Sequence, residues 1–110
     1  MCNYKPLFHD VSTGYVIYCF SCNMIKTGFG NFAVTLSRQD FADFFDLIKK
    51  NTAEQLLSSD LYNKTIVIPT PCEGIKILLS PKELNELFLM LDTADTELRS
   101  QELISLFGSH

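Results

Sequence analysis

The sequence predicts an α+β fold, with two helices on one face of a mostly antiparallel sheet of about five strands. Short β-branched and aromatic stretches with alternating polarity are separated by turn residues, and each group is followed by a stretch with helical spacing. The expected order is βββ-α-ββ-α with a long C-terminal helix. The length of 110 residues fits a single domain spanning residues 1–110.

The composition indicates a folded core and limits the possible partners. Apolar residues make up 46% of the chain, so a core can form without disulfides. The formal net charge of -4 disfavours phosphate backbones, and we expect no nucleic-acid partner. No apolar run reaches the roughly 18 residues of a membrane helix, and the first residues do not resemble a signal sequence. We therefore expect a cytoplasmic protein without membrane contact.

The first elements follow from the spacing of apolar residues. Residues 1–13 contain Pro6 and show no sustained period, so we expect an irregular N-terminal arm. From Gly14 the pattern has period two, which predicts a strand with Val16 and Tyr18 on one face.

Two tight turns are expected next. The segment Cys19-Phe20-Ser21-Cys22 is short enough to lie at the tip of a hairpin leading into a strand over residues 24–29. Gly30 and Asn31 tolerate positive φ and predict the turn before a strand over residues 31–36. The side chains of that strand expected to face the core are Phe32, Val34 and Leu36.

The first helix is predicted from Ser37, a capping residue, to about Lys50. It carries an apolar stripe at spacings of three and four, which we interpret as core packing rather than a ligand groove. The stripe consists of Phe41, Phe44, Phe45 and Ile48.

After a connector over residues 51–63, strands are expected over residues 64–68 and 75–79, joined as a second hairpin. Ser80-Pro81-Lys82-Glu83 then combines an N-cap, a proline at the first helical position and a glutamate three residues after the cap. This capping box predicts a long helix to about Phe107, with a break near Asp95 as the alternative.

The C-terminal helix carries apolar residues beyond those needed for one core face, and exposed apolar surface of this kind favours a homodimer. The apolar tail consists of Leu103, Ile104, Leu106 and Phe107. Residues 108–110, Gly-Ser-His, are interpreted as a frayed tail or the start of a tag.

Three motifs together resemble a family of small bacterial proteins that contain a domain of unknown function. These motifs are YCxxC at Tyr18 to Cys22, FGN at Phe29 to Asn31, and TIVIPTP at Thr65 to Pro71. The resemblance extends over most of the chain. It implies the fold and the cysteine pair, and it implies no activity.

The cysteines allow three interpretations. The first is a structural zinc site formed by Cys2, His9, Cys19 and Cys22, because zinc prefers four tetrahedral nitrogen and sulfur ligands. Such a site would hold the N-terminal arm against the hairpin. Cys72 could replace Cys2 as a ligand if the two loops converge.

The second interpretation is a cytosolic thiol-redox pair, with Cys19 as nucleophile and Cys22 as resolving thiol. Its sequence context is unfavourable, because strand-like residues rather than a helix follow the first cysteine. The third interpretation is four reduced cysteines with neither metal nor redox role.

No arrangement typical of catalysis appears in the sequence. There is no serine nucleophile elbow, and the TGFGN segment lacks the Lys-Ser or Lys-Thr pair of a phosphate-binding loop. We therefore expect a noncatalytic interaction or regulatory module, stabilised by zinc and bound to a protein partner that the sequence does not identify. The alternative is the thiol-redox protein.

Overall fold

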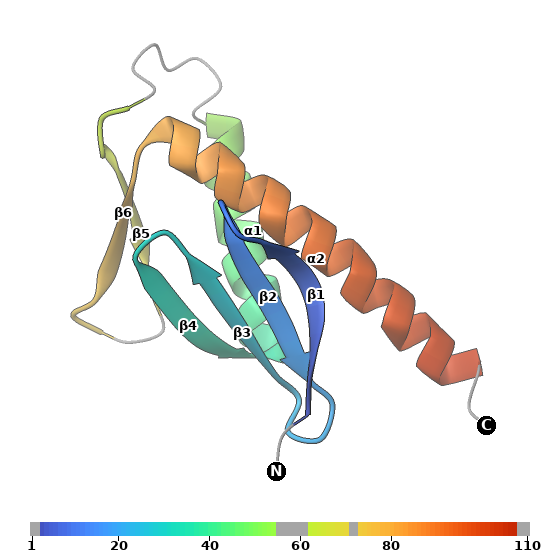
Figure 1. Ribbon diagram of the computed structural model, residues 1–110. Helices are drawn as coiled ribbons and strands as arrows, with labels where there is room; N and C mark the ends of the chain where they lie inside the picture. The colour runs from blue at the N-terminus through green and yellow to red at the C-terminus, as the bar shows by residue number, and fades with distance from the viewer. Residues whose placement is uncertain (1–2, 55–61, 71–72, 108–110) are drawn as a thin grey trace.

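The computed structural model describes residues 3–54, 62–70 and 73–107 (Figure 1). Two helices and two antiparallel sheets make up this part of the chain. In chain order the elements are β1 (Tyr4–Asp10), β2 (Gly14–Cys19), β3 (Met24–Phe29), β4 (Phe32–Ser37), α1 (Arg38–Glu54), β5 (Ile66–Pro69), β6 (Lys76–Leu79) and α2 (Pro81–Phe107).

The main sheet is a meander in which β1, β2, β3 and β4 pair in sequence order. The helices cover one face of it, α2 over β1 and β2 and α1 over β3 and β4 (Figure 1). Strands β5 and β6 form a separate hairpin. The α+β class, the one-sided helix layer and the long C-terminal helix are therefore as predicted.

The prediction of an irregular N-terminal arm over residues 1–13 was wrong, because Tyr4–Asp10 form strand β1 and raise the strand total above five. The pairing of β1 with β2 shifts register between Pro6 and Phe8, and Leu7 at that bulge is buried. A bulge interrupts the alternation of side chains, which hides the strand from a period-two search. Proline is tolerated here because β1 is an edge strand.

The two tight turns that were predicted, between β2 and β3 and between β3 and β4, form where they were expected. Phe29 pairs with Phe32 across a two-residue turn, and Gly30 at its first position has a φ of 57°, which favours glycine. Cys19 pairs with Met24, so the Cys-x-x-Cys segment lies at the tip of the β2–β3 hairpin. Asn23, the last residue of that turn, has a φ of 56°.

The caps predicted for both helices are present. The Ser37 hydroxyl accepts a hydrogen bond from the Asp40 amide at 3.0 Å. At α2 the Ser80 hydroxyl accepts from the Glu83 amide at 3.2 Å, and the Glu83 carboxylate accepts from the Ser80 amide at 2.9 Å. The alternative of a break near Asp95 is wrong, because α2 runs without interruption to Phe107.

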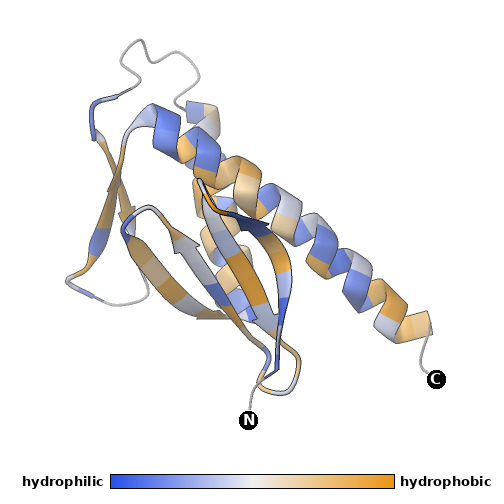
Figure 2. Ribbon diagram, viewed as in Figure 1, coloured by the Kyte–Doolittle hydropathy of each residue, from blue (hydrophilic) through white to orange (hydrophobic). Residues whose placement is uncertain are grey.

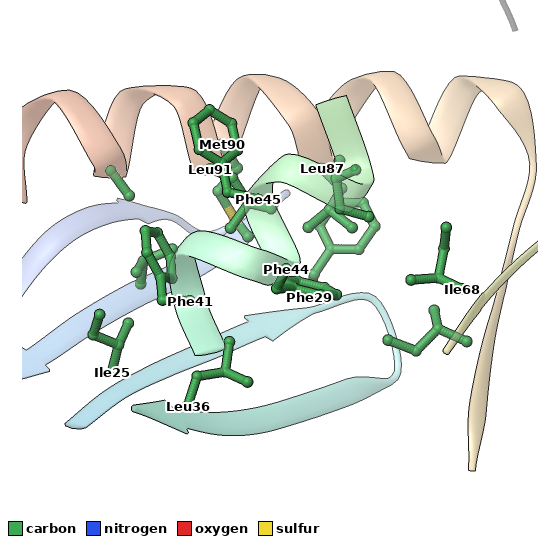
Figure 3. Close-up of a cluster of buried hydrophobic side chains, with 14 of the residues drawn as sticks. Ile25, Phe29, Leu36, Phe41, Phe44, Phe45, Ile68, Leu87, Met90 and Leu91 are labelled. Carbon is green, nitrogen blue, oxygen red and sulfur yellow. The ribbon is translucent and has the colours of Figure 1, made fainter. Parts of the chain in front are cut away.

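The core lies between the sheet and the two helices (Figure 3). The aromatic stripe of α1 packs into it as predicted, together with one row of sheet residues formed by Tyr18, Ile25 and Leu36. From α2, the buried side chains recur at spacings of three and four, which is the pattern of one helix face. They are Leu84, Leu87, Met90, Leu91, Ala94 and Leu98, and Pro81 and Asp95 of the same helix are also buried.

Candidate functional site

The candidate site is a corner formed by the β2–β3 turn, the start of α1 and the last turns of α2, which we name the C-terminal corner. Arg38 at the start of α1 donates hydrogen bonds to both carboxylate oxygens of Glu102 on α2, at 2.9 and 3.4 Å. This two-pronged contact raises the pKa of Arg38 and joins the two helices at this end of the molecule.

The β2–β3 turn lies near that ion pair, and contacts among its own side chains stabilise it. The Tyr18 hydroxyl donates a hydrogen bond to the Asn23 side-chain oxygen at 2.7 Å, and the Tyr18 ring meets Phe20 edge to face. Burial raises the pKa of Tyr18, and the nearby Glu102 carboxylate raises it further. Phe20 itself is half exposed, so the turn presents an aromatic ring to its surroundings.

A groove of about 330 Å³ separates this turn from α2. One wall is aromatic and the other is the underside of the helix end. The lining residues are Tyr18, Phe20, Gln101, Glu102, Ser105 and Leu106.

The last turns of α2 carry the most exposed cluster of large apolar side chains in the described part of the chain. The exposed fractions are 55% for Leu103, 63% for Ile104, 74% for Leu106 and 84% for Phe107. In Figure 2 this end of the helix is mostly orange, and Figure 1 shows it extending beyond the sheet. The C-terminal corner thus combines a groove with a projecting apolar helix end.

The structure does not bring the predicted zinc ligands together within its described residues. His9 pairs with Tyr15, whereas Cys19 pairs with Tyr4 at the other end of the hairpin. Cys19 is four positions after Tyr15, which corresponds to about 13 Å of strand. Cys2 and Cys72 lie outside the described residues. Among residues 3–54, 62–70 and 73–107, no group of three His, Cys, Asp or Glu side chains could hold a metal ion.

The two cysteines of the turn differ in accessibility. Cys19 is buried, with its sulfur 3.2 Å from the Ser21 hydroxyl oxygen, and Cys22 is exposed. An accessible thiol is the one that reacts first, so the exposures favour Cys22 rather than Cys19 as the nucleophile of a redox pair. The redox alternative itself stays a prediction.

Sequence reasoning missed the contacts that assemble the corner. Arg38 and Glu102 are 64 residues apart, and no local pattern links them. Phe20 lies in the turn as expected, but its ring contact with Tyr18 was not predicted. A signal was nevertheless present, because the apolar tail of α2 exceeds one core-facing stripe.

Fold and site together define a small α+β domain whose sheet is covered on one side and whose long helix ends in exposed apolar residues. Residues 1–106 match DUF6686, a family of unknown function, and the chain belongs to this family. No curated protein and no solved structure matches the chain. Within the described residues, no helix has both the length and the apolar character needed to cross a membrane.

Proposed function

We propose that this protein is a noncatalytic interaction module that forms a homodimer through its C-terminal corner. The observation that carries the proposal is the exposed apolar end of α2. Leu103, Ile104, Leu106 and Phe107 expose more than half of their surface each. Side chains of this size stabilise by about 1.5–3 kcal/mol each when they are fully buried, so a partner that covers them gains substantial free energy.

The arrangement of these side chains around the helix supports an interaction surface. Successive residues of an α-helix are turned by about 100°, so Ile104 and Leu106 point in nearly opposite directions. A helix segment that is apolar on several sides is typical of a buried environment. In the described part of the chain this segment projects beyond the sheet (Figure 1), and we infer that another molecule supplies the burial.

A second copy of the chain fits this surface because the corner carries both a projection and a groove. Leu106 lines the groove beside Tyr18 and Phe20, while Ile104 and Phe107 project from other sides of the same helix end. A two-fold axis beside the helix end would place the projection of each copy in the groove of the other. This reciprocity is what an isologous interface requires.

Electrostatics do not oppose such an arrangement. The Glu102 carboxylate at the groove is paired with Arg38, so two copies do not bring bare negative charges together. The surface consists of one helix end and one turn. We therefore expect reversible association of the kind seen for interfaces that bury less than about 1,200 Å² in total.

Sedimentation velocity over a range of protein concentrations tests the dimer. We expect the wild-type protein to associate reversibly, and Phe107→Glu to weaken association at least about tenfold, since a charge would enter an apolar interface. Leu89→Glu is the matched control, because Leu89 is also an exposed large apolar side chain on α2 but lies outside the corner.

Two results would contradict the proposal. One is a wild-type protein that stays monomeric at every concentration reached, and the other is equal weakening by Leu89→Glu and Phe107→Glu. Circular dichroism of both variants checks whether each retains the helical content of the wild type, and this separates lost association from lost folding.

A further inference from the structure

We propose that the free edge of β6 is a second binding site, which accepts an extended peptide of a partner protein as a third strand beside the β5–β6 hairpin. The peptide would carry a large apolar residue next to an acidic residue. This site lies at the opposite end of the molecule from the C-terminal corner (Figure 1) and does not depend on the homodimer.

The edge of β6 borders a groove. Residues 75–79 form one wall, and the β3–β4 turn with Phe29 and Phe32 forms the other. Lys64 and Glu83 complete the lining, and their charges are paired with each other at 2.9 Å. The volume is about 230 Å³, which is below the roughly 300–1,000 Å³ of pockets that enclose small-molecule ligands. The groove is thus large enough for a side chain that accompanies an extended backbone, and it is small for a metabolite.

The main chain of β6 can bond a further strand. Within the described residues β6 pairs only with β5, so β6 is an edge strand. In an antiparallel sheet alternate residues direct their N–H and C=O groups to opposite neighbours, which leaves half of these groups in β6 facing away from β5. A two-stranded sheet is marginal by itself, and a third strand adds main-chain hydrogen bonds as well as stability.

The side chains along β6 specify the residues of the added strand. Ile77 and Leu79 point into the core, and Lys76 and Leu78 point outward. A neighbouring strand has the same alternation, so one of its residues enters the groove near Phe29 and Phe32, where an apolar side chain fits.

The adjacent residue of that strand lies beside Lys76. Lys76 is exposed, and it forms no ion pair with any residue that the structure describes. An acidic residue opposite a lysine is a favourable cross-strand pair. Charge complementarity and groove shape therefore point to the same two-residue pattern.

A peptide fits the groove better than a second copy of β6. The β3–β4 turn lines the far side of the groove, and a strand added to β6 would lie between them, roughly 5 Å from β6. A second copy paired through its own β6 would bring a second β3–β4 turn to the same edge, and this crowding favours a peptide that carries no such turn. The outer face of the hairpin, with Val67 paired to Leu78, stays open in either case.

A library of short random linear peptides displayed on phage provides the probe. We expect selection on the wild-type protein to enrich peptides in which an acidic residue adjoins a large apolar one. Synthetic versions should bind Lys76→Glu about tenfold more weakly than wild type by fluorescence anisotropy, since an attractive pair becomes repulsive. Lys50→Glu is the matched control, because it makes the same charge change on an exposed position of α1.

Amide NMR shifts of the selected peptide complexes locate the site. We expect perturbation of residues 75–79 and of Gly30 and Asn31, and unchanged affinity in Phe107→Glu. The proposal is overturned by a selection without binders, by peptides that bind Lys76→Glu as tightly as wild type, or by shifts confined to α2. The two proposals can fail independently. Peptide binding without dimerisation would support only the β6 site, and dimerisation without peptide binding would support only the C-terminal corner.

Discussion

His9 and Cys19 lie on the same face of the β1–β2 hairpin, but the Pro6–Ile17 pair lies between them. Zinc binds histidine nitrogen at about 2.0 Å and cysteine sulfur at about 2.3 Å. The imidazole of His9 and the thiol of the buried Cys19 would have to converge on one ion from opposite ends of the hairpin. This geometry separates the role of His9 from that of the cysteine pair.

We expect His9→Ala to leave both the zinc content and the stability of the protein unchanged. His9 is exposed, and exposed substitutions of this kind change the free energy of unfolding by less than about 0.5 kcal/mol. Elemental analysis of protein purified without a chelator and urea unfolding measure the two quantities. Loss of zinc from His9→Ala, with zinc retained in wild type, would restore His9 as a ligand.

The sequence predicted the position of the cysteine pair but not the position of His9, the other described residue of the expected zinc site. The Cys-x-x-Cys turn depends on residues adjacent in sequence, and its position at a hairpin tip was predicted correctly. The position of His9 depends on β1, which was not recognised. The predicted ligand set therefore depends on an element without a local signal, and it stays a prediction.

At the scale of elements, the capping box of α2 connects local sequence with tertiary structure. The Glu83 carboxylate accepts from the Ser80 amide and from the Lys64 ammonium at 2.9 Å, so it holds the start of α2 against the segment before β5. These hydrogen bonds, the one from Ser80 first, lower the pKa of Glu83. The charged form is therefore favoured in the folded state.

We expect Glu83→Gln to destabilise the protein at neutral pH by about 0.2–1 kcal/mol, the usual range for a partly exposed pair. A group with a lowered folded pKa stabilises above its unfolded pKa, and this contribution disappears as pH falls through the folded pKa. The difference between wild type and Glu83→Gln should therefore shrink below the ordinary glutamate pKa of about 4.3. Urea unfolding of both proteins, from neutral pH to below this pKa, measures the difference in unfolding free energy.

Glutamine can still accept the hydrogen bond from Ser80, so Glu83→Gln tests the charge alone. Glu83→Ala removes the acceptor as well, and we expect a further loss of about 1 kcal/mol at neutral pH. A difference between wild type and Glu83→Gln that is constant with pH would show that the carboxylate charge does not stabilise the helix start.

Elements with complete local signals were predicted within a few residues. The errors fall where such a signal is missing or interrupted. The helix over residues 81–107 has a cap, a proline and an apolar period, and its start was correct. The α1 helix was expected to end at about Lys50 but continues to Glu54, because no helix-stopping residue follows Lys50. Strand β1 was missed because its bulge shifts the period.

At the scale of the whole molecule, α2 determines both the shape and the separation of the two proposed sites. Its 27 residues span about 40 Å, and the molecule measures 51 × 27 × 25 Å. The helix begins beside the β5–β6 hairpin and ends past the edge of the main sheet (Figure 1). Sequence periodicity predicted the helix. It could not predict which turns of the helix extend past the sheet, because this depends on how the sheet packs against the helix.

The exposed end of α2 should contribute to association rather than to the folding of one chain. We expect a chain that ends at Ile104 to lose at least about tenfold in dimer affinity, yet less than about 1 kcal/mol in unfolding free energy, because Leu106 and Phe107 are largely exposed. Leu98→Ala, at a fully buried position of the same helix, should cost about 2–5 kcal/mol. Urea unfolding at concentrations where the wild type is monomeric compares the three proteins. A truncation as costly as Leu98→Ala would mean that the helix end packs on its own chain, and the argument for a dimer would then fail.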